Sequence, residues 1–145
     1  WQCPQAEPFE YAVRETAAPA GDTVLEMDFR PLIRDFVESA RRGRPGAECA
    51  RAFHESLAAM LAEGAVRAAR AAELSRVALS GGCFANRLLL EGLTRRLQRQ
   101  GLEVLIHRLV PCGDGGLALG QAAVAAERLR REDAKPDSGS GKGSR

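Results

Sequence analysis

The spacing of apolar residues predicts alternating strands and helices from about residue 23 onward. Alternating or continuous apolar runs indicate strands over 23–29, 76–80 and 102–109. Recurrence at every third or fourth position indicates helices over 31–40, 47–72, 84–99 and 117–131. The sequence therefore predicts an α/β protein.

Three of these segments are expected to form one βαβ unit, because strand, helix and strand follow each other within about thirty residues. Such a unit pairs its strands in parallel with a right-handed crossover. The run over 102–109 is almost continuously apolar, which is typical of a strand covered on both faces. The last helix is expected to turn one apolar face inward, made up of Leu119, Ala122, Ala123, Ala126 and Leu129.

Both ends of the chain lack such a pattern. Residues 1–22 contain three prolines and no clear period, so we expect a loosely structured segment there. Residues 132–145 are rich in Ser, Gly and charge, and we expect this tail to be disordered. The folded lobe is accordingly predicted over 23–131.

Composition narrows the class of protein only a little. An apolar content of 45% in 145 residues suits one globular domain, and a net charge of +2 gives no electrostatic footprint for nucleic acid. Four cysteines at positions 3, 49, 83 and 112 form no C-x-x-C pair, which argues against a zinc ribbon. No signal peptide or membrane-spanning run is visible. We expect a reduced, cytoplasmic protein with neither a nucleic-acid nor a membrane partner.

The first candidate site follows the strand over 76–80. Gly81 and Gly82 separate this strand from a helical pattern, and Asn86 is expected in the first turn of that helix. Glycines let a ligand approach the backbone closely, and N–H groups at a helix N-terminus attract phosphate. The turn is either such a nucleotide cradle or a purely structural bend.

The second candidate site follows the strand over 102–109, where residues 111–116 read Pro-Cys-Gly-Asp-Gly-Gly. Neighbouring parallel strands end at one edge of a sheet, where ligands bind in α/β folds, so Asp114 is expected close to Gly81 and Gly82. Its carboxylate is suited to binding a cation, to assisting proton transfer or to capping the last helix.

Cysteine and histidine near these turns give weaker signals. Cys83 and Cys112 lie in or beside the turns and could face each other, and a Cys–His nucleophile with His107 is one hypothesis. Small apolar fillers are the simpler interpretation of both cysteines. His54, next to Phe53, is interpreted as a partly buried or surface histidine.

These motifs resemble a known family. Residues 77–90 read Val-Ala-Leu-Ser-Gly-Gly-Cys-Phe-Ala-Asn-Arg-Leu-Leu-Leu, and 111–121 read Pro-Cys-Gly-Asp-Gly-Gly-Leu-Ala-Leu-Gly-Gln. Both strings, with Ala52-Phe53-His54 before them, resemble the C-terminal part of the HypF carbamoyltransferases. The resemblance covers roughly Asp28 to Ala126.

The resemblance implies a fold and a reaction. The fold is the second lobe of an actin-like ATPase domain (ASKHA, sugar-kinase/Hsp70 type), as in Kae1-like transferases. The implied enzyme uses ATP and carbamoyl phosphate to make carbamoyl-adenylate in a YrdC-like domain. It then carbamoylates the C-terminal cysteine of HypE during [NiFe]-hydrogenase maturation.

The resemblance also implies site residues. Gly81, Gly82, Asn86 and Gly115 match the nucleotide-contacting loops, and Asp114 matches a carboxylate ligand of an iron or zinc ion. The family takes two further metal ligands from a His-x-x-x-His helix in the first lobe. Neither that helix nor the YrdC-like domain occurs in this sequence, which is therefore expected to be a fragment, a split subunit or a remnant, inactive alone.

Two alternatives stay open. The chain could be the lobe of an O-carbamoyl- or tRNA threonylcarbamoyltransferase relative, with a different acceptor. It could also be a non-catalytic interaction module that keeps the same fold.

Overall fold

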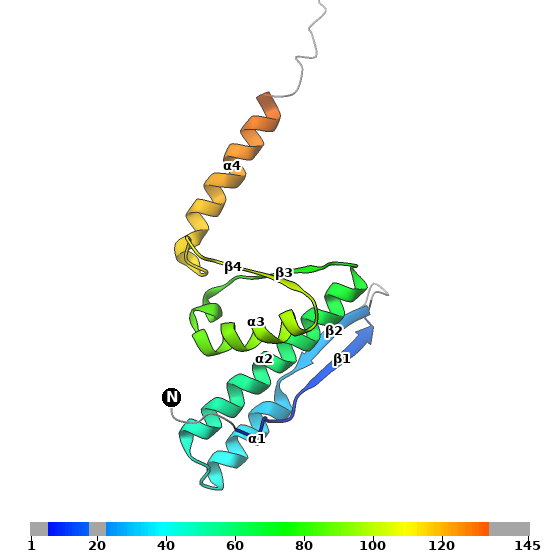
Figure 1. Cartoon of the computed structure of the whole chain (residues 1–145), viewed down its shortest axis with the longest axis vertical. Coiled ribbons are helices and arrows are strands. Elements are labelled where there is room, and N and C mark those ends of the chain that lie inside the picture. The colour runs from blue at the N-terminus through cyan, green and yellow to red at the C-terminus, as the bar shows by residue number, and fades with distance from the viewer. Residues whose placement is uncertain (1–5, 18–22, 134–145) are drawn as a thin grey trace, which may run out of the picture.

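The computed structural model describes residues 6–17 and 23–133. Two short strands, β1 and β2, precede two helices, α1 and α2, and the remaining chain is a strand–helix–strand unit followed by one helix (Figure 1). The elements are β1 (Ala12–Ala17), β2 (Thr23–Asp28), α1 (Arg30–Arg41), α2 (Gly46–Ala71), β3 (Arg76–Leu79), α3 (Arg87–Arg99), β4 (Glu103–Ile106) and α4 (Leu117–Asp133). Single 3₁₀ turns occupy Gly82–Ala85 and Asp114–Gly116.

Helix α2 is the element on which α1, α3, β3 and the β1–β2 hairpin pack (Figure 1). Its small residues allow close approach on two sides. A Cβ on Gly92 of α3 would lie 3.3 Å from the Cβ of Ala58, and a Cβ on Gly64 would lie 3.3 Å from the Met27 sulfur. The many Ala and Gly residues of α2 thus bring α3 and the β1–β2 hairpin against its backbone.

Two apolar clusters make up the core. The larger joins α2, α3 and β3, and its buried members are Ala58, Ala62, Val66, Leu79, Leu89, Leu93 and Leu97. The smaller joins α1, α2 and the N-terminal segment around Phe9 and Leu32, where Phe36 packs edge-on against Phe9 and Phe53. Burial of Phe9 and the hydrogen bond from its N–H to Ser56 Oγ (2.6 Å) tie the N-terminal segment to α2.

The βαβ prediction is confirmed. Strands β3 and β4 pair in parallel, from Arg76 opposite Glu103 to Leu79 opposite Ile106, and α3 connects them. Strands β1 and β2 form a separate antiparallel hairpin. Because Leu79 and Ile106 are paired at the ends of β3 and β4, the loops that follow both strands leave the sheet side by side.

A small network of salt bridges connects α2 and α3. Glu55 accepts from Arg96 at 2.6 Å and pairs with Arg51 at 2.9 Å. Burial alone would raise the pKa of Glu55, but the hydrogen bond and charge of Arg96, together with Arg51, lower it. The carboxylate stays charged and fixes the rotation of α3 against α2.

Three expectations from the sequence are wrong. The segment 1–22 was expected to be loosely structured, yet it contains β1 and the buried Phe9. Strand β4 ends at Ile106 instead of 109, and its faces are not both covered, since Leu105 is 47% exposed. Among the described residues this sheet has two strands, and α3 is the only helix that contacts β4 closely.

The third error concerns α4, which extends away from the other elements (Figure 1). Leu119 and Leu129 of its expected inward face are 58% and 61% exposed, and Ala122, Ala123 and Ala126 are exposed as well. Its Ala, Leu, Glu and Arg content favours helix without tertiary contacts, and Glu127 pairs with Arg130 and Arg131 one turn on.

Two further findings bound the description. None of the helices in the described part of the chain is long and apolar enough to span a membrane. The tail was expected to be disordered over 132–145, but Glu132 and Asp133 belong to α4. Residues 134–145, like 1–5 and 18–22, lie outside the described residues.

The junction between β2 and α1 gives the first testable prediction. Asp28 accepts hydrogen bonds from the side chain of Arg30 (2.7 and 2.8 Å) and from its backbone N–H (3.0 Å). These bonds, with the charges of Arg30 and Arg14, lower the pKa of Asp28 from 3.8 to about 2. A carboxylate with a lowered pKa stabilises the fold above its unfolded pKa, and this contribution disappears as the pH falls through the folded pKa.

We therefore expect Asp28→Asn to lower the unfolding midpoint at pH 6 and to have a shrinking effect between pH 4 and about pH 2. Thermal unfolding across this range measures the difference from the unaltered chain. Glu26→Gln, on the same strand but exposed, is the matched control and should show no such trend. A difference for Asp28→Asn that stayed constant from pH 6 to pH 2 would contradict this role.

Candidate functional site

The two glycine-containing turns lie against each other. The N–H of Gly81 donates to the carbonyl oxygen of Cys112 at 2.7 Å, although the residues are 31 positions apart in sequence. A Cβ on Gly113 would lie 3.4 Å from the Cα of Gly82. The expectation that the loops after β3 and β4 meet at one edge of the sheet is confirmed.

A cleft of about 700 Å³ lies between these turns and the first half of α4. Its walls include the predicted site residues Gly81, Gly82 and Asp114. His107, which the sequence suggested only as a partner for a cysteine, also lines it, as do Ser80 and Arg128, which the sequence did not single out. Asn86 and Gly115 do not line it. The structure thus brings three of the five predicted site residues to one surface.

The glycine turn differs in detail from the expectation. Gly81 has φ +112°, a conformation that side-chain-bearing residues rarely adopt. A 3₁₀ turn over Gly82–Ala85 then precedes α3, which begins only at Arg87. Since the N–H of Gly81 is bonded to Cys112, it is not directed at a ligand, and the expected direct entry from the glycines into a helix N-terminus is wrong.

Asn86 is the N-cap of α3, not part of its first turn. Its Oδ1 accepts from the N–H groups of Leu88 (3.1 Å) and Leu89 (3.3 Å), and its Nδ2 lies 2.8 Å from Nε2 of His54. His54 Nδ1 lies 2.7 Å from the carbonyl oxygen of Ala50. These contacts fit one tautomer, with the proton on Nδ1 and Nε2 accepting from Asn86. His54 is partly buried, as expected, and it anchors the cap of α3 to α2.

The second turn is held by close packing around its glycines. A Cβ on Gly116 would lie 2.5 Å from the carbonyl oxygen of Pro111 and 2.9 Å from a methyl carbon of Val110. Gly115 sits over the Pro111 ring, where a Cβ would be in ordinary contact at 3.5 Å. These two glycines therefore shape the loop, and Gly116 leaves no room for a side chain.

Asp114 begins the 3₁₀ turn that leads into α4. No hydrogen bond to its carboxylate occurs among the described residues, so the capping interpretation is not supported there. Nor do three or more His, Cys, Asp or Glu residues of the described chain gather in a metal-binding group. Asp114 lines the cleft and carries the one carboxylate among its lining residues.

The cysteine hypotheses find no support in the geometry. Cys49, Cys83 and Cys112 are all free thiols. His107 Nε2 lies 2.9 Å from Ser80 Oγ, so its bonded partner is a hydroxyl and not a thiol. Sequence reasoning missed Ser80; the register of β3 and β4 was the signal that could have paired it with His107.

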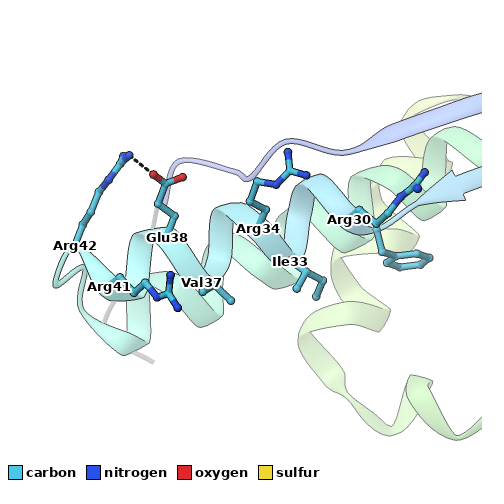
Figure 2. A pocket seen from close by; sticks show the side chains of 8 residues that line it. Arg30, Ile33, Arg34, Val37, Glu38, Arg41 and Arg42 are labelled. Carbon is cyan, nitrogen blue, oxygen red and sulfur yellow. Dashed lines mark hydrogen bonds and ion pairs between the residues drawn. The ribbon is translucent and has the colours of Figure 1, made fainter.

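A second hollow, on the exposed side of α1, carries no comparable chemistry (Figure 2). Two rows with a spacing of four residues line it: one is Phe29, Ile33, Val37 and Arg41, and the other is Arg30, Arg34, Glu38 and Arg42. Arg30 and Arg42 are already paired with Asp28 and Glu38. The rows form a ridge and groove suited to side-chain packing, without a nucleophile or a glycine cradle.

Residues 1–121 match the family described as carbamoyltransferase, Kae1-like domain, second subdomain. The chain belongs to the HypF carbamoyltransferase family. The match begins at residue 1, so the family relationship extends further toward the N-terminus than the motifs alone indicated.

Curated relatives agree with this membership. The chain is 45% identical to carbamoyltransferase HypF of Rhizobium leguminosarum bv. viciae, over 87% of this chain and 17% of the relative. It is 43% identical to a HypF homolog of Cupriavidus necator, over 70% of this chain and 26% of the relative. It is also 37% identical to a tRNA N6-adenosine threonylcarbamoyltransferase of Ralstonia pickettii, over 69% of this chain and 28% of the relative.

Solved HypF structures share the fold. A full-length HypF in its phosphate- and nucleotide-bound form superposes with a TM-score of 0.77 at 29% identity, over 88% of this chain and 16% of that one. HypF of T. kodakarensis superposes with a TM-score of 0.63 at 28% identity, over 74% and 14% of the two chains. The expected α/β lobe of a Kae1-like transferase domain is confirmed, and the chain spans about an eighth to a quarter of the HypF relatives it matches.

The packing at Gly116 gives the second prediction. Gly116→Ala should displace the loop over 110–116 and cost roughly 1–3 kcal/mol of unfolding free energy, because the new Cβ clashes with backbone. Chemical denaturation measures the cost, and amide NMR shifts of Gly81 and Gly82 report the displacement. Gly120→Ala, four residues on with nothing within 4 Å, is the control and should leave both unchanged or stabilise α4. Unshifted Gly81 and Gly82 amides in Gly116→Ala would refute the coupling of the turns.

Proposed function

We propose that this chain is the nucleotide-contacting lobe of an ATP-dependent carbamoyltransferase. The complete enzyme makes carbamoyl-adenylate from carbamoyl phosphate and ATP in a YrdC-like domain and carbamoylates the C-terminal cysteine of a HypE-type acceptor. The missing first lobe and adenylation domain are required partners, so the chain alone is inactive. Hydrogenase maturation, in the cytoplasm, is the process that this activity serves.

The observation that carries the proposal is the cleft that the two turns form with α4. Gly81 and Gly82 line this cleft, and Asp114 carries the one carboxylate among its lining residues. A superposable HypF has been solved with phosphate and nucleotide bound, which supports a nucleotide as the occupant of a cleft at this edge of the sheet. In this proposal Gly82 approaches the phosphates, Gly81 shapes the turn, and Asn86 and Gly115 hold the two loops in place.

Asp114 is proposed as one ligand of a divalent metal, iron or zinc. Asp114 lines the cleft, and its carboxylate receives no hydrogen bond from the described residues, which leaves its oxygens able to bind a cation. A bound metal would supply a Lewis acid for phosphate or carbamoyl oxygen atoms. The other ligands must come from outside the described residues, since no three-ligand group exists among them.

The identity to a tRNA threonylcarbamoyltransferase supports a second candidate with a different acceptor. The HypF relatives are more similar and cover more of this chain, which favours a protein cysteine as acceptor. The acceptors are distinguished by whether the complete enzyme modifies a cysteine-terminated protein or a tRNA. A non-catalytic module of the same fold would modify neither.

Nucleotide binding by the lobe is the direct test. We expect the chain to bind ATP weakly, with NMR shift changes at residues of the cleft. Gly82→Trp should weaken binding by at least about tenfold, because the indole fills the cleft whereas a glycine leaves it open.

Gly46→Trp is the matched control, since Gly46 lies at the start of α2 with nothing within 4 Å and outside the cleft. Equal ATP affinity for Gly82→Trp and Gly46→Trp would rule out the cleft as the nucleotide site.

Metal binding is tested in the complete enzyme that carries this lobe. Asp114→Ala should weaken the affinity for iron or zinc at least about tenfold, because a carboxylate ligand is lost, and less metal should remain bound. Metal content by elemental analysis and the unfolding midpoint of the same sample separate ligand loss from misfolding. Glu26→Ala, an exposed carboxylate on β2, is the control. Unchanged metal content in a folded Asp114→Ala enzyme would remove Asp114 from the metal site.

A further inference from the structure

Ser80 and His107 both line the cleft, and the hydrogen bond between them is exposed to solvent. Ser80 follows β3 directly and His107 follows β4 directly, one residue beyond the paired Leu79 and Ile106. Ser80 Oγ and His107 Nε2 are 2.9 Å apart, and both residues line the cleft beside Gly81 and Gly82. Neither the motif comparison nor the proposed metal site accounts for this pair.

We propose that His107 and Ser80 form a hydrogen-bond relay that recognises the phosphate of the bound nucleotide; this inference rests on the proposed function. In the relay, His107 Nε2–H donates to Ser80 Oγ, and the hydroxyl proton of Ser80 donates to a phosphate oxygen. His107 touches Ser80 and not the ligand, so it is a positioning residue.

The direction of the bond follows from the chemistry of the ligand. A hydroxyl has one proton and two lone pairs, so Ser80 can accept from His107 and donate to the ligand at the same time. In the reverse direction the Ser80 hydroxyl would donate its proton to the imidazole. Only an oxygen lone pair would then face the anion, which it would repel. An anionic oxygen in the cleft therefore selects the arrangement in which Nε2 carries the proton.

The groups around Ser80 offer phosphate no comparable hydrogen-bond donor. The N–H of Gly81 is bonded to Cys112 and is not available to an anion. The ionisable side chains that line the cleft with His107 are Cys112, Asp114 and Arg128. The Asp114 carboxylate repels phosphate unless a cation intervenes, and Arg128 lies on α4, which few contacts hold. Ser80 is a donor fixed to the sheet itself.

The competing interpretation is that the Ser80–His107 hydrogen bond is purely structural, because it also connects the ends of β3 and β4. A purely structural bond would affect stability and would influence the binding of all ligands alike. A phosphate relay would affect ATP and leave adenosine, which has no phosphate, unaffected. The comparison of these two ligands is therefore the decisive readout.

The experiment titrates the whole chain with ATP and with adenosine, by NMR. Ser80→Ala and His107→Leu should each weaken ATP binding about tenfold, as expected for one lost hydrogen bond to a charged group, with adenosine binding unchanged. The double variant should lose no more than either single one, because the two residues act as a unit. His107→Gln, whose amide can still donate, should retain most of the ATP affinity.

Arg76→Met is the matched control, since Arg76 pairs with Glu103 (2.7 Å) across the opposite end of the same two strands. It should change neither affinity. Equal weakening of ATP and adenosine by Ser80→Ala, or ATP binding that is unaltered in both single variants, would overturn the relay. Failure of the proposed function is recognised separately: the unaltered chain would then not bind ATP, or Gly82→Trp would bind it equally well.

Discussion

Parallel pairing of β3 with β4 is the constraint on which the site depends. The register brings Leu79 opposite Ile106, so the next residues of both strands emerge together and the bond from Gly81 N–H to Cys112 closes the gap between the loops. A two-stranded sheet is weak by itself. Here the buried Leu79 connects it to the cluster formed by α2 and α3, so the packing of these helices also positions the cleft.

Helix α2 contributes to the site without lining it. His54 links α2 to Asn86, the cap of α3, and Glu55 links α2 to Arg96 farther along the same helix. Both contacts fix α3, which in turn connects β3 to β4. The two histidines of the chain thus serve the same edge of the sheet in different ways: His54 through the helix cap and His107 through Ser80.

The sequence predicted those elements whose own residues show a strand or helix pattern. The βαβ unit and the meeting of its two turns followed from strand-like runs, helical spacing and glycines. Strand β1 was missed because it is mostly exposed and shows no apolar alternation, and because the burial of Phe9 depends on residues of α2 far along the chain. The inward face predicted for α4 was wrong because periodicity shows that a face is apolar and does not show what covers it.

The sequence predicted which loops form the candidate site, but it did not predict which hydrogen bonds their residues make. Motif and topology together indicated Gly81, Gly82 and Asp114, whereas the roles of Asn86 as a cap and of the Gly81 N–H as a loop contact required coordinates. Ser80 and His107 are ordinary residues in sequence, and only the register of the strands brings them together.

Hydrogen exchange of the chain with and without ATP measures the central claim most directly. If one nucleotide occupies the cleft that both turns line with α4, ATP should slow amide exchange in 80–86 and 110–116 together, and leave α1 unaffected. Slowed exchange in only one of these loops, or at the α1 surface of Figure 2 in their place, would contradict the account.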